Sequence, residues 1–300
     1  MTTVSINISL AERYRGAMLG LACGDAVGCT VEFYPREKFE PRTDMTGGGK
    51  FRLNPGEWTD DTSMAICLAS SLLDCQGHDP VDQMNRYSHW YSTGQPGPKS
   101  RPVGIGKTIL QSLFKFRRDG DPYAGNSNPR TAGNGALMRL APVPLAYFPN
   151  YEKIHEYTKL STLTTHAAEQ CIQASAHLAE ILSRLLSGRS RNDIEDVCDD
   201  WKGLAILPSS QIHGIGYAPE SLRAAVWAFL STESFEQAIL AAVNLGDDAD
   251  TTAAICGQMA GAYYGENAIP QNWLEKLFMK DEISALADDL YRLALSLDKV

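Results

Sequence analysis

The chain has 300 residues, of which 44% are hydrophobic, so it is long enough to bury a sizeable core. Its formal charge of −9 and its isoelectric point of about 5.2 argue against a surface that binds nucleic acid or anionic membranes. The seven cysteines are odd in number and form no C-x-x-C pair, which predicts reduced thiols in an intracellular protein.

The segment RYRGAMLGLAC resembles the start of a signal peptide, because two arginines come directly before an apolar run. Gly16 and Gly20 interrupt this run and it ends at Asp25, so it is too short for a signal peptide. No stretch elsewhere approaches the length of a membrane span. We therefore expect a soluble, cytoplasmic protein without a membrane partner.

Apolar residues recur with helical spacing along most of the chain, and no β-branched run of strand length stands out. The pattern of THAAEQCIQASAHLAEILSRLL predicts a helix that starts near His166 and has Thr164 or Thr165 as its N-cap. The sequence therefore predicts an all-α fold. The other helices predicted in this way cover residues 10–27, 61–74, 80–92, 105–118, 220–230, 234–243, 250–264 and 281–297.

Three segments rich in Gly, Pro and charged residues are predicted to be loops: residues 32–58, 93–106 and 118–135. None is a low-complexity linker between independent cores, and no repeat of solenoid period is visible. The most informative motifs lie near both ends of the chain, so a site built from them requires the two ends to meet. Residues 1–300 are therefore expected to form a single compact multi-helix domain.

Two acidic clusters each stand directly before a predicted helix that is rich in small residues. The first is WTDDTSMA, with Asp60 and Asp61, and the second is NLGDDADTTAA, with Asp247, Asp248 and Asp250. A helix N-terminus stabilises one nearby carboxylate by about 0.3–1 kcal/mol, which does not offset the repulsion among two or three of them. Each acid alone fits an N-cap or a solvated turn residue, but the complete set indicates a cation site.

Hard divalent cations such as Mg²⁺ or Mn²⁺ match clusters that offer carboxylate and hydroxyl oxygens. An EF-hand is excluded because, counting from Asp248, its Gly and Glu positions are taken by Ala253 and Met259. Zinc is disfavoured because neither cluster contains Cys or His. If the two clusters meet in one cleft, they predict a two-metal site that activates water and holds a substrate.

These clusters belong to a larger set of motifs that resembles the ADP-ribosylglycohydrolase family, which includes enzymes that remove ADP-ribose from a modified arginine of dinitrogenase reductase. The motifs run in family order from residue 16 to about residue 265. They read GAMLGLACGDAVGCTVEF, WTDDTSMA, AGNGALMRLAPV, THAAEQC and NLGDDADTTAAICGQMAGAYYG. The resemblance implies an all-α fold with a central cleft that holds two Mg²⁺ or Mn²⁺ ions.

The resemblance also implies the ligands of these ions, through the W-T-D-D and G-G-D-x-D-T motifs of the family. The six implied ligands are Thr59, Asp60, Asp61, Asp248, Asp250 and Thr251. Asp250 is the candidate for bridging both ions. Asp247 replaces the second glycine of the latter motif, and we expect it to be a turn acid that faces solvent and binds no metal.

Glu32 in GDAVGCTVEF matches the family's glutamate, whereas without the resemblance it would be taken for a surface residue. Its implied role is to activate water or to protonate a leaving group, and the resemblance adds catalytic roles for Asp60 and Asp61. Asp25 is expected to have a structural role at a helix end.

Two further residues match family positions near the substrate. His166 in TTHAAEQC corresponds to a histidine near the metal and the distal ribose, although a lone His at a helix start is also typical of a cap or a packed polar residue. Tyr217 in HGIGYAPE corresponds to an aromatic near the substrate, with core packing as the alternative.

Two glycine-rich loops are expected to bind the ADP part through backbone N–H groups. Their residues are Gly104, Ile105 and Gly106 of VGIGKT, and Gly133, Asn134 and Gly135 of AGNGALMR. VGIGKT is no P-loop, because the Walker motif requires Gly at the position that Arg101 occupies. Some arginine-directed family members carry an Asp at the position of Gly104, so its absence here argues against arginine as the target residue.

We therefore expect a hydrolase that uses two divalent cations to release ADP-ribose from a modified protein or a small ADP-ribosyl conjugate. We expect it to act as a monomer, without a nucleic-acid partner. A metal-dependent phosphoesterase or nucleotide pyrophosphatase would use the same carboxylates but release AMP. A non-catalytic member of the fold would bind ADP-ribose without turnover, but the presence of all six implied ligands and Glu32 favours an enzyme.

Overall fold

The structure is a computed structural model that describes residues 8–298, and it confirms the all-α prediction. Within this range no β-strand is formed, and only isolated β-bridges link loop segments. The α-helices are α1 (Leu10–Gly28), α2 (Asp60–Asp74), α3 (Pro80–Thr93), α4 (Lys107–Asp119), α5 (Pro142–Tyr147), α6 (Tyr151–Leu163), α7 (Glu169–Leu186), α8 (Ala218–Leu230), α9 (Phe235–Val243), α10 (Ala249–Tyr264), α11 (Gln271–Lys276) and α12 (Lys280–Leu297).

Short 3₁₀ helices occupy parts of the connecting segments. They are Arg36–Lys38, Pro129–Thr131, Arg191–Val197, Asp199–Trp201, Leu204–Ile206, Ser209–Gln211 and Glu266–Ala268. Every helix predicted from residue 10 to 118 and from 220 to 297 is present, with ends that differ by at most two residues from the prediction.

The predicted start of the helix near His166 is wrong. α7 begins at Glu169 and has Ala168 as its N-cap, while Thr164 is the C-cap of α6. The N–H of His166 donates to the carbonyl of Thr162 at 2.8 Å, so this residue still belongs to the turn that ends α6. The two threonines therefore close one helix and do not cap the next.

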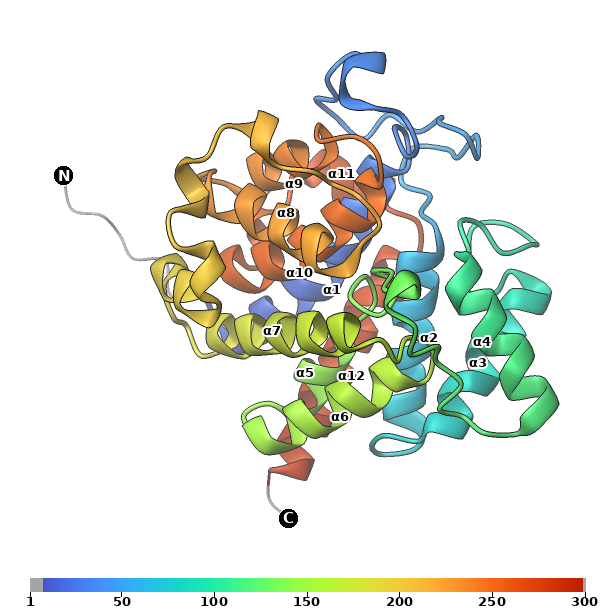
Figure 1. Ribbon diagram of the computed structural model, residues 1–300. Coiled ribbons are helices and arrows are strands. Elements are labelled where there is room, and N and C mark those ends of the chain that lie inside the picture. Colours follow the sequence, from blue (N-terminus) through green and yellow to red (C-terminus); the bar gives the residue numbers. More distant parts are fainter. Residues whose placement is uncertain (1–7, 299–300) are drawn as a thin grey trace.

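Helices α1 and α10 form the centre of the molecule and run antiparallel along their whole length (Figure 1). A Cβ atom built on Gly20 would lie 2.2 Å from the carbonyl oxygen of Gly257, and one on Gly16 would lie 2.2 Å from that of Gly261. Only glycine permits so close a contact between two backbones. The glycine spacing of α1 therefore brings its C-terminal end directly against the first turn of α10.

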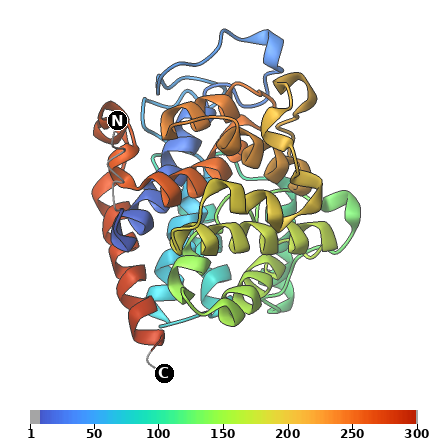
Figure 2. The same ribbon diagram turned by 90° about the vertical axis from the view of Figure 1, so that its left-hand side faces the viewer.

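The remaining helices pack around this pair. Helices α2, α3 and α4 lie together on one side in Figure 1, and α8 and α9 pack against α10. Figure 2 shows α12 along one edge of the molecule, where it contacts α1, α2 and α5. The largest cluster of buried apolar side chains extends from Tyr14 to Ala294, so both ends of the described chain contribute to one core.

The cysteines form no disulfide among the described residues, and the helices can be compared with the length and hydropathy of a membrane span. All seven cysteines are free, and five of them are buried; the exposed one is Cys75, and Cys198 is half-buried. No helix between residues 8 and 298 is both long and apolar enough to cross a membrane.

Candidate metal centre and active-site cleft

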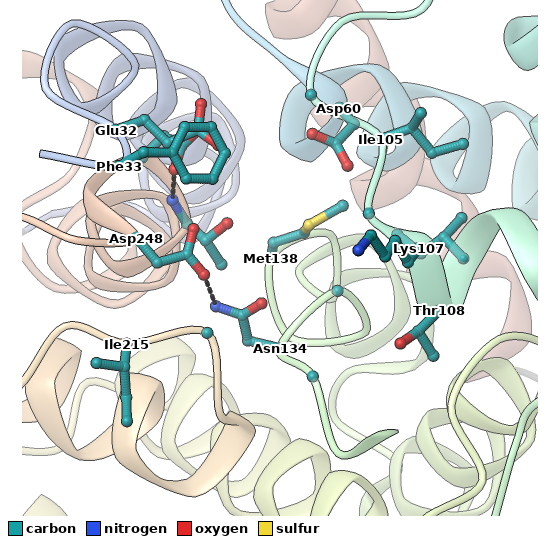
Figure 3. A pocket seen from close by; sticks show the side chains of 18 of the residues that line it. Glu32, Phe33, Asp60, Ile105, Lys107, Thr108, Asn134, Met138, Ile215 and Asp248 are labelled. Atoms are coloured by element: carbon teal, nitrogen blue, oxygen red, sulfur yellow. Dashed lines mark hydrogen bonds between the residues drawn. The ribbon is translucent and has the colours of Figure 1, made fainter. Parts of the chain in front are cut away.

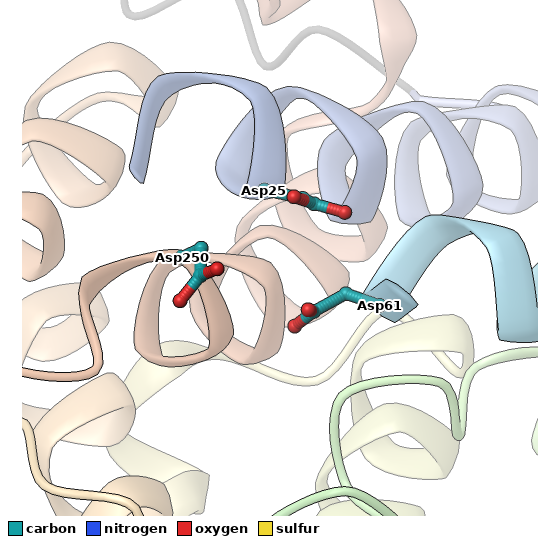
Figure 4. A group of neighbouring side chains, drawn as sticks. All are labelled: Asp25, Asp61 and Asp250. Carbon is teal, nitrogen blue, oxygen red and sulfur yellow. The ribbon is translucent and has the colours of Figure 1, made fainter. Parts of the chain in front are cut away.

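Three helix ends converge on one buried point and carry the acidic residues there. Asp25 lies in the last turns of α1, Asp61 in the first turn of α2, and Asp250 in the first turn of α10 (Figure 4). Each carboxylate is at most 2% exposed. Two of these ends are helix N-termini, whose unpaired N–H groups favour negative charge.

Asp25 joins α1 to the start of α2. Thr59 and Thr62 each donate a backbone N–H and a hydroxyl to its carboxylate, at distances between 2.7 and 3.1 Å. The side chain of Thr59 makes no capping bond of its own, so a residue of another helix caps α2. This contact agrees with the expected structural role of Asp25.

The carboxylates form two groups that share Asp250. In one group, oxygens of Asp25, Asp61 and Asp250 lie within 4.8 Å of one another. In the other, oxygens of Glu32, Asp248 and Asp250 satisfy the same limit. Asp250 is thus common to both groups, and Asp25, which is not in the predicted ligand set, belongs to the first.

The two threonines of the predicted set also reach this centre. The hydroxyl of Thr59 lies 3.1 Å from Asp61 Oδ2 and 3.5 Å from Asp250 Oδ2. Thr251 lines the cleft and donates its backbone N–H to Asp250 Oδ1 at 2.8 Å. Thr59 therefore places its hydroxyl oxygen beside the carboxylates, and Thr251 holds Asp250 through its backbone N–H.

The pKa values of these acids are displaced upward, chiefly because burial penalises the charged form. Burial raises the pKa of Glu32 to about 9 and that of Asp60 to about 8. Burial and the neighbouring carboxylates also raise the pKa values of Asp61 and Asp250 well above the ordinary range. In the protein alone, this centre therefore holds protons at neutral pH.

The donor set fits hard divalent cations. Asp61 Oδ1 and Glu32 Oε2 are buried without a hydrogen-bond partner among the described residues. Such unsatisfied acceptors are costly in a folded protein unless a cation or proton occupies them. Carboxylate and hydroxyl oxygens at this spacing suit Mg²⁺ or Mn²⁺.

A cleft of about 700 Å³ opens above the centre (Figure 3). Asp60 lines it on the side opposite Glu32 and Asp248, and belongs to neither of the two carboxylate groups. Glu32 is only 5% exposed, which excludes the reading of an ordinary surface residue. All six residues of the two predicted glycine loops line the cleft: Gly104, Ile105, Gly106, Gly133, Asn134 and Gly135.

His166 and Asn134 both line the cleft. The amide of Asn134 donates to Asp248 Oδ2 at 2.7 Å, which fixes that carboxylate (Figure 3). His166 is 2% exposed, and a Cβ built on Gly135 would lie 2.9 Å from its ring. Glycine at this position therefore leaves room for the imidazole.

The structure explains why position 104 carries glycine. Gly104 has a φ of +89°, a region that L-residues rarely adopt. A Cβ atom there would lie 2.2 Å from Asp60 Oδ1. An aspartate at this position would therefore displace the carboxylate of Asp60.

Asp247 forms the turn that leads into α10, as predicted. Its φ of +55° lies in the left-handed region that glycine adopts most easily. Its backbone bonds to Phe33 and Tyr34, at 2.7 and 2.9 Å, attach the segment after Glu32 to α10. Its side chain is half-buried at the cleft, so it is less open to solvent than expected.

Tyr217 does not line the cleft. It is the N-cap of α8 and is 39% exposed, so it is no core residue either. Its neighbour Gly216 borders the cleft, and a Cβ there would lie 3.0 Å from Asp248 Oδ2. The substrate contact of Tyr217 stays a prediction.

Several cleft residues were missed from the sequence. Lys107 is the only lysine or arginine among the described residues that line the cleft, and it stands in the first turn of α4. The rejected P-loop reading contained Lys107 and Thr108, and both line the cleft. Phe33 borders the cleft with a φ of +68° and 54% exposure. The adjacent Glu32 was the only signal that could have indicated it.

Comparison with known proteins agrees with this geometry. The sequence model of the ADP-ribosylglycohydrolase family matches residues 7–298. The chain is 38% identical to ADP-ribosylarginine hydrolase Tri1 of Serratia proteamaculans, over 94% of this chain and 80% of that protein. It is 32% identical to ADP-ribosyl-[dinitrogen reductase] glycohydrolase of Rhodospirillum rubrum, over 95% of this chain and 98% of that protein.

A solved structure shows the same architecture. It is described as an ADP-ribosylglycohydrolase-related protein complex and aligns with a TM-score of 0.83 at 42% sequence identity. The alignment covers 95% of this chain and 99% of the other. The chain belongs to the ADP-ribosylglycohydrolase family of enzymes.

Proposed function

We propose that the protein hydrolyses the glycosidic bond between ADP-ribose and a modified protein side chain, with two divalent cations, and releases ADP-ribose. The observation that carries this proposal is the pair of carboxylate groups that share Asp250 beneath the cleft. A volume of about 700 Å³ lies within the range of small-molecule sites.

The two cations would be held by the carboxylate groups and by adjacent hydroxyls. The residues concerned are Asp25, Thr59, Asp60, Asp61, Asp248, Asp250 and Thr251. When bound, Mg²⁺ or Mn²⁺ stabilises developing negative charge and orients water and ribose hydroxyls. Asp60 lines the cleft but belongs to neither carboxylate group, so it is also placed to contact substrate directly.

Glu32 is the residue that handles the proton. It borders both the carboxylate centre and the cleft, and burial raises its pKa to about 9. A protonated Glu32 can give its proton to the nitrogen or oxygen that leaves the anomeric carbon. Its conjugate base can then take a proton from the attacking water.

The ADP part occupies the wall formed by the glycine loops and α4. The N-terminus of α4 and the ammonium group of Lys107 attract the diphosphate, since no other lysine or arginine of the described chain lines the cleft. Gly133 and Gly135 leave their side of the cleft open for the ribose next to His166.

We assign arginine as the acceptor. The ADP-ribosylarginine hydrolase of Serratia proteamaculans is 38% identical to this chain, which outweighs the missing acid at position 104. A side chain at position 104 would collide with the carboxylate of Asp60, so local packing accounts for the glycine there.

Product analysis on a substrate panel tests the function. We expect free ADP-ribose from ADP-ribosylated arginine, no product in EDTA, and recovery with Mg²⁺ or Mn²⁺. ADP-ribosylserine protein and free ADP-ribose serve as the other substrates. AMP formation would indicate a pyrophosphatase, and binding of ADP-ribose without turnover of any conjugate would indicate a non-catalytic protein.

Asp247 and Asp248 are adjacent, yet we expect opposite results from them. Asp247→Gly should leave kcat/KM within about twofold and raise stability by up to about 1 kcal/mol, because it relieves a left-handed non-glycine residue. Asp248→Asn should lower kcat/KM by at least about tenfold, because it removes a charge from the group around Asp250. Steady-state kinetics at fixed Mg²⁺ and thermal unfolding measure both. Equal losses would show that the two acids share one role.

A further inference from the structure

Arg139 is an unusual residue for a protein core. Among the described residues it is the only buried lysine or arginine, at 1% exposure, and it forms no ion pair. It donates to the carbonyl of Gly135 at 2.8 Å and to the hydroxyl of Thr165 at 2.6 Å. Its guanidinium carbon lies 4.7 Å from the ring centre of Tyr87. Burying a charge is costly, and here these contacts and the attraction of Asp60, whose pKa the charge of Arg139 lowers, offset part of that cost.

The contact with Thr165 fixes the direction of the next hydrogen bond. A guanidinium group only donates, so the Thr165 oxygen is an acceptor in that bond. The threonine has one hydrogen left to give, and His166 Nδ1 lies 2.9 Å away. No other acceptor contacts this hydroxyl among the described residues, and Thr165 is fully buried. Only an Nδ1 without hydrogen satisfies the buried hydroxyl.

The opposite ring nitrogen faces the cleft. His166 lines it, and Nε2 has no hydrogen-bond partner in the described chain. Cβ atoms built on Gly133 and Gly135 would lie 3.5 and 3.3 Å from Nε2, so the two glycines leave this nitrogen accessible. Burial, together with the charge of Arg139, lowers the pKa of His166 to about 3.

We propose that Arg139 and Thr165 are positioning residues that hold His166 with its hydrogen on Nε2, so that it presents a fixed donor to an oxygen of the bound ADP-ribosyl group. The chain of contacts runs from Arg139 through Thr165 to His166. These contacts give His166 a neutral N–H donor in a cleft that is otherwise lined by several carboxylates. This inference rests on the proposed function for the identity of the ligand, but the tautomer is a property of the free protein.

Nitrogen NMR of the histidine rings, on the full chain labelled with ¹⁵N-histidine, tests the tautomer directly. His166 is one of six histidines, and its signals are identified by their loss in His166→Gln. At neutral pH we expect a protonated Nε2 and an unprotonated Nδ1. A hydrogen on Nδ1 in the wild-type protein would overturn the inference.

Thr165→Val and Thr165→Ser form a matched pair. The valine keeps the shape but loses the hydroxyl, so the Nδ1 signal should move towards that of a mixture of tautomers. Loss of this single hydrogen bond should also lower kcat/KM by about tenfold. The serine restores the hydroxyl and should restore both the spectrum and the kinetics. A valine variant with the wild-type spectrum and rate would contradict the proposal.

Arg139→Gln extends the test to the start of the chain of contacts. We expect the same change of the His166 signals; where this variant does not fold, the Thr165 pair decides alone.

The proposed function and the proposed positioning of His166 can be contradicted independently of each other. A protein that cleaves no ADP-ribosyl conjugate but shows the expected tautomer contradicts only the function. An active enzyme with hydrogen on Nδ1 contradicts only the positioning role.

Discussion

Glu32→Gln is expected to lower kcat by about 10²–10⁴-fold, the range typical for the loss of a general acid or base. Glutamine keeps the size and polarity of the side chain but neither donates an acidic proton nor accepts one. Glu32 is buried beside Asp250 and borders the cleft, so the amide will occupy the same place. Release of ADP-ribose in single-turnover experiments measures the chemical step.

Binding and stability distinguish this role from a structural one. Titration calorimetry should show that Glu32→Gln still binds ADP-ribose, and thermal unfolding should show no loss of stability, because the variant removes a buried acid. Glu37→Gln is the control, since Glu37 is an exposed glutamate on the same connecting segment. A Glu32→Gln enzyme within threefold of the wild-type kcat, or a loss of similar size in Glu37→Gln, would exclude the role in proton transfer.

Most of the longer helices could be predicted from the sequence, whereas α5, α6 and α11 were missed. α3 and α9 were found almost to the residue, because each has a capping residue at the start and regular apolar spacing. α5 was missed because it has six residues, two of them prolines, and all of them are buried. A short helix without a polar face leaves no periodic signal.

Some residues of the candidate site could be recognised from their sequence neighbours, whereas others belong to it only because of tertiary packing. Asp60, Asp61, Asp248 and Asp250 were recognisable because each stands at a helix start, where an acid has a local meaning. Asp25 lies inside the last turns of an apolar helix, and nothing in its sequence neighbours indicates that α2 and α10 meet it there. Its place in the centre depends on the close packing of the glycines of α1 against α10.

Lys107 and Arg139 were missed for a related reason. VGIGKT was compared with one phosphate-binding template and rejected, although a helix N-terminus attracts anions without a Walker motif. Arg139 follows an apolar run, and its burial becomes visible only when Tyr87 and Thr165, both distant in the sequence, surround it.

Removal of divalent cations should have the largest effect of all: loss of activity together with a stability that falls as the pH rises. In the protein alone, the buried acids have raised pKa values, with Glu32 at about 9 and Asp60 at about 8. The folded state therefore binds more protons than the unfolded chain, whose acids titrate near pH 4. The resulting stability is complete below about pH 4 and is lost as the pH rises through about 8 to 9.

Cations reverse this dependence, because they bind the ionised carboxylates and compete with protons. At a concentration of about 100 times Kd, an ion stabilises the folded state by about 2.7 kcal/mol. This corresponds to a rise in Tm on the order of 5 °C for a chain of this size. We expect the rise on adding Mg²⁺ or Mn²⁺ to be larger at pH 8 than at pH 5. Calorimetric or fluorescence melting in EDTA and in each metal, at constant ionic strength, measures it.

Asp250→Asn is the decisive control, because Asp250 belongs to both carboxylate groups. The variant removes one ionisable acid, so its stability in EDTA should fall less steeply with pH than that of the wild type. It should also lose most of the Tm rise on adding metal, since neither group keeps its full set of charges. A wild-type protein whose stability in EDTA increases from pH 5 to pH 8 would contradict the raised pKa values. A Tm rise of equal size in Asp250→Asn would place the cations elsewhere in the molecule.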